Sequence, residues 1–330
     1  MHYAYWALMG LNLNQYATAT AQPGLSVKVI NEVLFPLPPL TEQKAIVKRL
    51  EELLKLEGEI AAESAALDDL ITAAKRKVLD LAIRGKLVPQ DSSDEPASEL
   101  LKRIAAKRET QVSTDRRSRS KGSSVIFRGA DRSAYETCDG KTVCIDDEIP
   151  FDIPDSWAWA RLGAFISIIA GVSYQKGDVT TTGVRILRGG NIKEDAHICL
   201  NNEDVFLSQQ YADPSTTIRK GDVVIVASTG SSTVIGRPAI ASEDMPSVQI
   251  GAFLRILRAK DGSSREWLPV IVLGDYYREH IREQSKGTSI KNLKAKYLDE
   301  MLIPLPPLAE QRRIVAKIEE VRELMQSLTK

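Results

Sequence analysis

The sequence predicts an α+β protein in which one strand-rich domain is flanked by two long helices of coiled-coil type. Three observations predict this fold. A proline-rich motif occurs twice, each copy leads into a helix with heptad spacing, and Val- and Ile-rich runs separated by turn residues lie between the copies. The 330 residues, 43% hydrophobic and 27% charged, suffice for one or two packed domains.

The repeat is the most informative feature of the chain. Residues Phe35–Val47 recur as Ile303–Val315 at an offset of 268 residues, so one structural unit is used twice. Three prolines in each copy fix an extended backbone. A helix follows each copy, and Glu42 and Glu310 lie in its first turn, where the helix dipole favours a negative charge.

Both helices carry an apolar seam in alternating steps of four and three residues. The first is expected over Thr41–Arg84, about 66 Å at 1.5 Å per residue, with Gly85 as its C-cap. It either packs along its own domain or serves as a spacer between two lobes. The residues predicted to pair the helices are Ile46, Leu50, Leu53, Ile60, Leu67, Ile71, Val78, Leu81, Ile314, Ile318, Val321, Met325 and Leu328.

The segment between the first helix and the compact domain reads as a linker. A short amphipathic helix is expected over Pro96–Lys107. Thr110–Ser124, with four basic residues among serines, is either a solvated linker or an arm that touches phosphates. The N-terminal stretch Ala4–Met9 is apolar, too short to span a bilayer and without a basic residue before Lys28; we expect it to be the packed end of a domain.

The compact domain begins near Ile149. Its apolar runs predict strands, and two further segments predict helices. The expected strands are 165–169, 184–187, 205–207, 223–227 and 251–257, and the expected helices are 267–282 and 290–298.

Polar, glycine-rich loops at 187–191, 227–233 and 284–291 offer hydroxyls, amides and cations that suit base edges and phosphates. Ordinary turn chemistry is the alternative explanation of each loop. The candidate DNA-binding residues are Tyr174, Lys176, Arg188, Asn191, Ser228, Thr229, Ser231, Ser232, Arg237, Lys286, Thr288 and Lys291.

Charge, cysteine and motif counts favour a non-catalytic protein. The 44 basic and 44 acidic residues balance, so DNA binding would require locally grouped basic residues or a partner that contacts phosphates. Cys138, Cys144 and Cys199 form no disulfide framework and no metal-ligand pattern with the three histidines, which favours a reducing cytosol and no metal site. No phosphate-binding loop, dinucleotide fingerprint or nucleophile–histidine constellation is found, so no catalytic residue is assigned.

The doubled Pro-Leu-Pro-Pro-Leu-x-Glu-Gln motif resembles the specificity subunits of type I restriction-modification systems. Trp157–Gly163, Leu187–Ile192 and Arg84–Gln90 are similar to further conserved segments of that family. The resemblance implies five regions. They are the remnant tail of a first target-recognition domain (1–34), a central conserved coiled-coil helix (35–86), a linker with a short helix and a basic arm (87–148), a target-recognition domain (149–302) and a distal conserved coiled-coil helix (303–330).

The same resemblance implies the function. The domain would read one half of a bipartite target in double-stranded DNA, while the two helices pair antiparallel and dock methylation subunits. Those partners would use S-adenosylmethionine for adenine-N6 methylation, and a restriction subunit would use ATP and Mg. This chain would hold no cofactor and would work in the cytoplasm without a membrane partner. A homodimer through the helices would read an inverted repeat.

Three other hypotheses remain open. The chain could be a coiled-coil adaptor that binds protein, a specificity module paired with a different nuclease-methylase, or a non-functional truncated fragment. DNA recognition predicts affinity that falls steeply with salt, whereas the adaptor predicts no DNA affinity.

Overall fold

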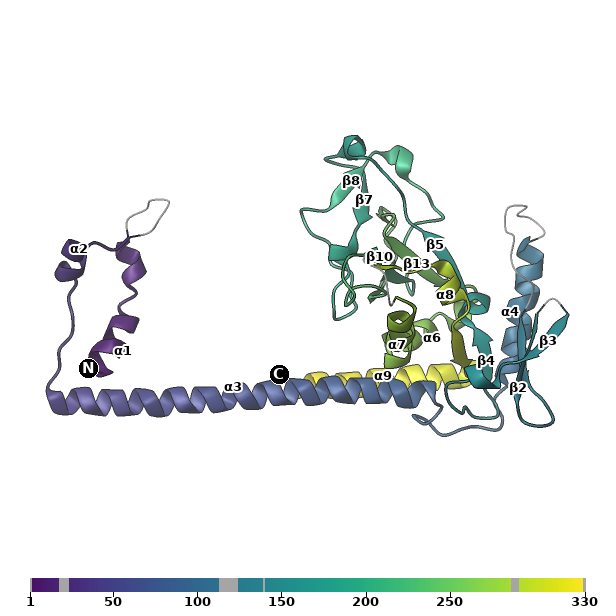
Figure 1. The fold of residues 1–330 in the computed structure, drawn as a ribbon, viewed down its shortest axis with the longest axis horizontal. Coiled ribbons are helices and arrows are strands. Elements are labelled where there is room, and N and C mark those ends of the chain that lie inside the picture. Colours follow the sequence, from purple (N-terminus) through teal and green to yellow (C-terminus); the bar gives the residue numbers. More distant parts are fainter. Residues whose placement is uncertain (1, 18–23, 113–123, 139, 286–290, 329–330) are drawn as a thin grey trace. The chain divides into compact units, whose positions relative to one another are not determined.

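The computed structural model describes residues 2–17, 24–112, 124–138, 140–285 and 291–328 (Figure 1). The chain divides into two compact units, Met1–Thr72 and Ala73–Lys330. Within the described ranges, no helix is both long enough and apolar enough to cross a membrane. The basic arm expected at 110–124 lies largely outside the described residues.

The first unit consists of helices and a proline-rich extended segment. Tyr3 donates a hydrogen bond from its hydroxyl to the Pro36 carbonyl oxygen at 3.0 Å, and its ring meets that of Phe35 edge to face. No residue of α1 is buried, so the prediction that this stretch is the packed end of a domain is wrong. The elements are α1 (His2–Gly10), η1 (Leu13–Tyr16), α2 (Val27–Glu32) and the first part of α3 (Leu40–Ile83).

Helix α3 begins and ends one residue before the predicted bounds, and the predicted C-cap is confirmed. Gly85 has a φ of 67°, and the amide of Lys86 donates to the Leu81 carbonyl oxygen at 2.9 Å. A Cβ at Gly85 would lie 2.4 Å from Cγ of Pro154. The left-handed backbone and this close contact both require glycine.

The second unit contains two four-stranded sheets, which confirms the predicted α+β class (Figure 1). One is antiparallel and the other includes a parallel pair, β12 with β7. The first sheet has the order β11 (Pro238–Ile240), β9 (Val223–Val226), β13 (Leu254–Ala259) and β5 (Ile166–Ala170). The second has the order β12 (Val248–Ile250), β7 (Val184–Leu187), β8 (Val205–Leu207) and β6 (Val179–Thr180).

The apolar run of β9 is explained by burial on both faces. Val223 and Ile225 belong to the core beneath the helices, whereas Val224 and Val226 belong to the core shared with the second sheet. Because side chains alternate across a strand, a strand covered on both sides is apolar at every position. The strand predicted at 223–227 is thus confirmed as β9, one residue shorter, and it pairs on both edges inside the sheet.

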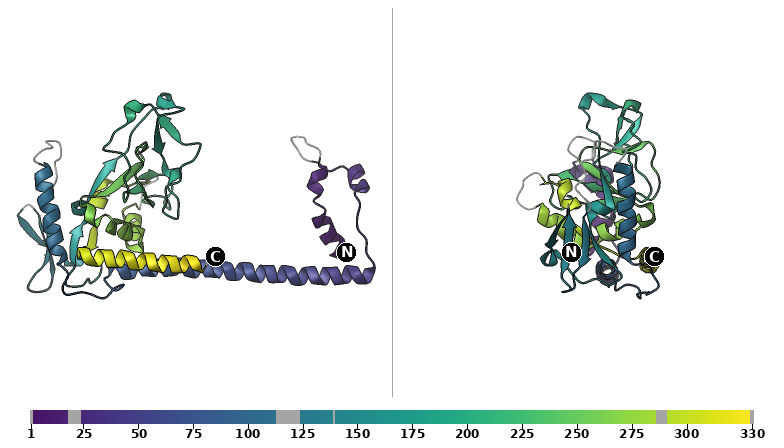
Figure 2. Two further views of the ribbon diagram at one scale, coloured as in Figure 1. Left: turned by 180° about the vertical axis from the view of Figure 1, so that it is seen from behind. Right: turned by 90° about the vertical axis from the view of Figure 1, so that its right-hand side faces the viewer.

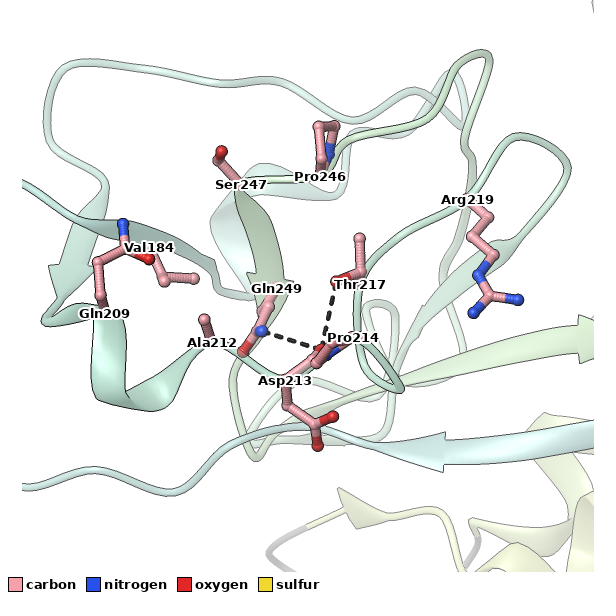
Figure 3. Close-up of a pocket in the computed structure, with 10 residues that line it drawn as sticks. All are labelled: Val184, Gln209, Ala212, Asp213, Pro214, Thr217, Arg219, Pro246, Ser247 and Gln249. Atoms are coloured by element: carbon pink, nitrogen blue, oxygen red, sulfur yellow. Dashed lines mark hydrogen bonds between the residues drawn. The ribbon is translucent and has the colours of Figure 1, made fainter.

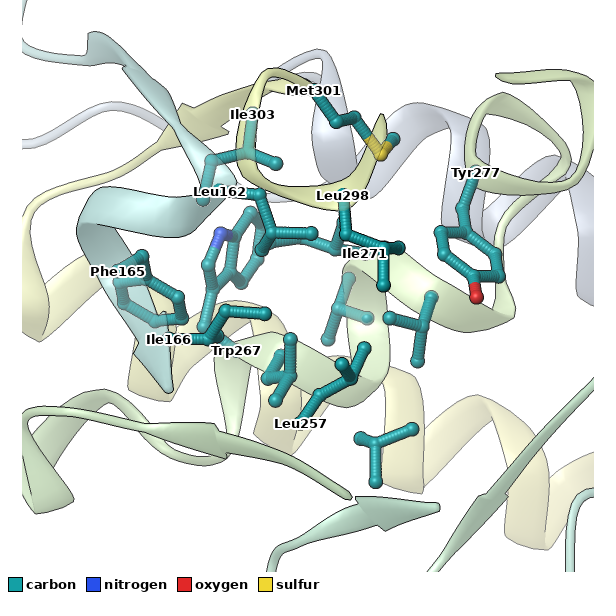
Figure 4. Close-up of a cluster of buried hydrophobic side chains, with 14 of the residues drawn as sticks. Leu162, Phe165, Ile166, Leu257, Trp267, Ile271, Tyr277, Leu298, Met301 and Ile303 are labelled. Carbon is teal, nitrogen blue, oxygen red and sulfur yellow. The ribbon is translucent and has the colours of Figure 1, made fainter. Parts of the chain in front are cut away.

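Four helices cover the antiparallel sheet. They are α6 (Trp267–Leu273), α7 (Asp275–Gln284), α8 (Ala295–Asp299) and the short α5 (Leu162–Phe165). The indole of Trp267 is fully buried among Leu162, Phe165 and Ile303 and donates to the Pro304 carbonyl oxygen at 3.0 Å (Figure 4). The helix predicted over 267–282 is interrupted at Gly274, and Ile290–Leu298 contains only one short helix.

Strands that were not predicted occupy part of the expected linker. An antiparallel sheet has the order β1-β2-β3. Its strands are β1 (Val125–Arg128), β2 (Ala134–Cys138) and β3 (Lys141–Cys144), and they follow α4 (Ala97–Val112). Arg161 joins this sheet to the rest of the second unit, because its guanidinium donates to the Glu136 carboxylate, with 2.6 Å between Nη2 and Oε2.

Elsewhere in this unit, burial raises the pKa of the Tyr276 hydroxyl to about 12.

The distal helix α9 (Leu308–Ser327) runs antiparallel to the end of α3 that belongs to this unit, as both views show (Figures 1 and 2). Ile314, Val315 and Ile318 share an apolar cluster with three residues of α3, Leu79, Ala82 and Ile83. Within this unit, α9 and the end of α3 therefore share one apolar core.

Candidate nucleic-acid interface

One tight turn connects four of the polar segments singled out in the sequence. We call it the hub turn, residues 250–254. The Gly251 amide donates to the Leu187 carbonyl oxygen at 2.9 Å, next to the Arg188 loop, and the Val172 amide donates to the Ile250 carbonyl oxygen at 2.8 Å. The Phe253 carbonyl oxygen accepts from the amides of Ala227 and Ser228 at 2.8 and 3.1 Å. Backbone hydrogen bonds thus join segments that are far apart in sequence to the same turn.

A fourth segment joins the hub turn indirectly. The Leu293 amide donates to the Ala227 carbonyl oxygen at 2.8 Å, and the two-stranded ladder β10 (Ser228–Thr229) with β14 (Lys291–Asn292) pairs Thr229 with Lys291. Backbone hydrogen bonds fix these positions. Within the loop after β10, the Thr229 hydroxyl accepts from the Ser231 amide at 3.2 Å, and the Ser231 and Thr233 hydroxyls lie 2.9 Å apart.

Hydrogen bonds to its own carbonyl oxygens stabilise the hub turn. Nη1 of Arg255 donates to the carbonyl oxygens of Ala252 and Leu254, both at 2.7 Å, and the Leu254 amide donates to the Gly251 carbonyl oxygen at 2.9 Å. A Cβ at Gly171 would lie 2.2 Å from the Gly251 oxygen, so only glycine permits this approach. The turn is therefore a rigid platform.

The Arg188 loop is ordered by a buried asparagine. Asn191 accepts from the Arg188 amide at 2.7 Å and donates to the Cys199 carbonyl oxygen and to Asp204, at 2.8 and 2.6 Å. Its side chain is only 3% exposed, and its amide is used within the loop. Asn191 shapes the loop, whereas the Arg188 side chain is exposed.

The other candidate residues differ in their exposure and in the contacts that their side chains make within the chain. Arg237 is half-buried and pairs with Glu194 at 3.0 Å, and Tyr174 packs against the small core of the second sheet. Lys176 and Ser232 are exposed, while Ser228, Thr229 and Ser231 are half-buried. Lys286 and Thr288 lie outside the described residues, and Lys291 is described only through its backbone. The structure thus brings the loops around 174, 188, 228 and 291 to one turn.

Phe253 is the member of this region that the sequence analysis missed. It lies on the hub turn and its side chain is 66% exposed. The sequence predicted a strand over 251–257, whereas the strand begins at Leu254. A Gly-Ala pair before an aromatic residue was the available signal for a turn that presents the ring.

A cavity of about 410 Å³ lies at the opposite end of the parallel pair β7–β12 (Figure 3). Val184 and Gln249 are its buried lining residues, and Nε2 of Gln249 donates to the Asp213 carbonyl oxygen at 3.1 Å. Oγ1 of Thr217 donates to the same oxygen at 3.2 Å. These bonds hold the loop that leads to β9 against the second sheet.

The two copies of the repeat share their local structure. In each copy, the backbone N–H of the glutamine donates to the carbonyl oxygen four residues earlier at 2.9 Å. Its side-chain Nε2 donates to the carbonyl oxygen five residues earlier, at 2.8 Å in the first copy and 2.9 Å in the second. These residues are Gln43 with Pro39 and Pro38, and Gln311 with Pro307 and Pro306. The shared Pro-Leu-Pro-Pro-Leu-x-Glu-Gln residues therefore produce the same hydrogen bonds at the start of α3 and of α9.

The surroundings of the two copies differ. In the second, Leu302 and Ile303 are buried in β15 (Leu302–Leu305), which pairs with β4 (Ala158–Arg161). Their counterparts Leu34 and Phe35 are 91% and 37% exposed, and Leu37 is 75% exposed. The second copy is thus completed by strand β4 of the second unit, whereas in the first copy Leu34 and Leu37 are exposed and Phe35 contacts Tyr3.

A buried carboxylate also distinguishes the second copy. Glu310 is fully buried and accepts from Nε1 of Trp157 at 2.9 Å and from Nε2 of Gln90 at 2.5 Å. Burial raises the pKa of Glu310, and the two hydrogen bonds partly oppose that rise. Glu42, in the first copy, is exposed.

The predicted helix-pairing residues fall into two groups. Exposed positions are Leu53, Ile60, Leu67 and Leu328, and buried positions are Ile71 and Ile314. The remaining positions, Ile46, Leu50, Val78, Leu81, Ile318, Val321 and Met325, are half-buried. At the end of α3, the core contains Ala82 and Ile83, because this last turn lies in the same apolar cluster as α6 and α9.

Among the described residues, no group of three or more His, Cys, Asp or Glu side chains could hold a metal ion, and the three cysteines are free.

Comparison with known proteins identifies the family. A family model described as "Type I restriction modification DNA specificity domain" matches residues 1–64 and 200–330. The specificity subunit of the type I restriction enzyme EcoAI of Escherichia coli is 27% identical over 335 residues, covering 87% of this chain and 52% of the relative. That of StySPI of Salmonella potsdam is 30% identical over 172 residues, covering 51% and 36%.

A solved structure supports the fold assignment. A chain from the structure described as "Structural basis underlying complex assembly and conformational transition of the type I R-M system" aligns with a TM-score of 0.56 at 20% identity. The alignment covers 98% of this chain and 62% of that chain. The present chain thus spans about half the length of the curated relatives. The chain belongs to the family of type I restriction-modification DNA specificity subunits.

Proposed function

We propose that this chain reads duplex DNA through the loops joined at the hub turn, as the non-catalytic specificity subunit of a type I restriction-modification complex. The observation that carries the proposal is the hub turn itself. It links the loops that begin at Leu187, Val172 and Ala227 and, through Leu293, the strand that contains Lys291. Base recognition needs several side chains on one rigid support, and this turn supplies the support.

The proposed contacts fall into two classes. Arg188 and Lys176 are exposed cations suited to guanine edges or phosphates, and the hydroxyls of Ser228, Thr229 and Ser232 suit base edges or phosphates. Tyr174, Ser231, Arg237, Lys286, Thr288 and Lys291 remain proposed contacts. Asn191 would contribute by shaping the Arg188 loop.

We propose further that this domain reads one half of a bipartite target. The second copy of the repeat is completed by β4 of the domain, whereas Leu34 and Leu37 of the first copy are exposed. Leu34 and Leu37 would then be covered by the matching strand of another recognition domain. That domain could come from a second copy of this chain or from another polypeptide, and the symmetry of the target distinguishes the two.

The conserved helices would dock methylation subunits that use S-adenosylmethionine, and a restriction subunit that uses ATP and Mg would join the complex. The support for this part is family membership together with the apolar seam of α3, where Leu53 and Ile60 are exposed. No cofactor is proposed for this chain.

The test is selection of duplexes from a random library by the full chain, followed by binding measurements at several salt concentrations. We expect one enriched motif, with affinity that falls steeply as salt rises. Replacing Arg188 by Ala should relax one base position by about 1–3 kcal/mol or, if Arg188 meets phosphate, reduce the salt slope by about 1. The matched control is Arg278→Ala, an exposed arginine on α7.

No enrichment and no DNA affinity would reject this proposal and favour an adaptor that binds protein. Enrichment that Arg188→Ala and Arg278→Ala affect equally would reject the role of the hub-turn loops.

A further inference from the structure

Phe253 presents an apolar ring in the middle of a polar surface. Its side chain is 66% exposed on the hub turn, and no other aromatic ring contacts it among the described residues. Phe127, an exposed phenylalanine elsewhere in the same unit, is 45% exposed and stacks on Tyr135 at 6.0 Å between ring centroids. Packing within the chain therefore explains Phe127 but leaves most of the Phe253 ring without a contact.

The backbone that carries Phe253 is held on both sides. Its carbonyl oxygen accepts two backbone amides, from Ala227 and Ser228, and Arg255 fixes the carbonyl oxygens of the residues before and after it. A ring held in this way loses little further backbone entropy on binding, so its contact surface is available at low cost.

The neighbours of Phe253 limit what it could contact in DNA. Ser228 is joined to its carbonyl oxygen, Thr229 follows in β10, and Asn292 lies opposite Ser228 in β14. Hydroxyl and amide groups suit the donors and acceptors of base edges. The 5-methyl group of thymine is the apolar feature of the major groove, and phenylalanine is one of the side chains that contacts it.

We infer that Phe253 is a specificity-determining residue that packs on the methyl group of a thymine in the target half-site. The inference rests on the proposed function, because it requires the hub turn to face bases. It makes a direct prediction about the target, namely that the half-site read by this domain contains a thymine whose methyl group is required.

The experiment replaces each thymine of the selected duplex by uracil, which removes only the methyl group. With the full chain, we expect one such replacement to weaken binding roughly fourfold, the value for losing burial of about one methyl-sized group. The Phe253→Ala chain should bind the thymine and uracil duplexes equally, and Phe253→Leu should keep part of the discrimination. Phe127→Ala, the matched control, should discriminate as the unaltered chain does.

Three results would overturn the inference while leaving DNA reading intact. These are a selected half-site without thymine, equal binding of all uracil duplexes by the unaltered chain, or unchanged discrimination in Phe253→Ala. A fourth result would also overturn it. If 2-aminopurine placed next to a thymine that uracil can replace became more fluorescent on binding, the ring would be inserted between bases and not packed on a methyl group. Absence of any selective DNA binding would instead reject the proposed function and this inference with it.

Discussion

Replacing Trp157 by Phe removes one hydrogen bond to a buried charge and leaves most of the ring packing. Nε1 of Trp157 donates to Glu310 at 2.9 Å, and the indole packs edge to face on Trp267 at 5.8 Å. Hydrogen bonds to charged groups contribute about 1.5–3 kcal/mol. Because the carboxylate is fully buried, the second unit should lose about that much stability in addition to the packing loss.

A double-mutant cycle separates the two terms. Trp157→Phe is measured in the unaltered chain and in a Glu310→Met background, where only the packing loss remains. The coupling free energy from urea unfolding should be about 1.5–3 kcal/mol, and Trp157→Phe alone should lower Tm by several degrees, at about 2–4 °C per kcal/mol for a unit of this size. A coupling below about 0.5 kcal/mol would refute the view that this bond joins α9 to the recognition domain.

Three further substitutions test other parts of the structure. Gly171→Ala places a Cβ 2.2 Å from the Gly251 oxygen and should lower both the Tm and the DNA affinity. Burial raises the pKa of Glu310, so the folded state binds the Glu310 proton more tightly than the unfolded state does. The free energy of unfolding, measured by urea titration relative to Glu310→Gln, should therefore fall as the pH rises from the ordinary pKa of a glutamate through the raised pKa. Arg258→Met leaves Asp222 without the contacts at 2.6 and 2.8 Å and should cost about 3–5 kcal/mol by urea unfolding.

Each of these has a matched control. Gly262→Ala has open space around the new Cβ and should leave the Tm unchanged, so equal effects of the two glycine substitutions would contradict the packing argument. Lys317→Met removes an exposed pair with Glu320 and should change stability by less than about 1 kcal/mol. A pH dependence identical in the unaltered chain and Glu310→Gln would contradict the assigned burial effect.

Local patterns in the sequence predicted much of the second unit. The bounds of β7 and β8 were predicted correctly, because each is a short apolar run between turn residues. The C-cap at Gly85 was predicted because its signal lies in a single residue. The β1–β3 sheet was missed, since β2 and β3 mix charged and polar residues with apolar ones, and β1 is only four residues long.

The candidate site was predicted only in part, because its geometry depends on contacts between distant segments. The polar loops were identified from composition, but the turn that joins them depends on backbone bonds from Val172, Leu187 and Ala227. No sequence pattern distinguishes an exposed asparagine from Asn191, which is buried. Phe253 was assigned to a strand, because the apolar run that follows Gly251 outweighed the turn signal of the Gly-Ala pair.

The most direct test is a methylome. The chain would be expressed with the methylation subunits proposed to bind it, in a bacterium without DNA methylation, and modified adenines would be mapped across the genome. We predict that methylation falls in one recurring bipartite motif, palindromic if two copies of this chain act together and asymmetric if a second recognition domain comes from elsewhere. A soluble complex that leaves the genome unmethylated, or methylates it without a motif, would contradict the account.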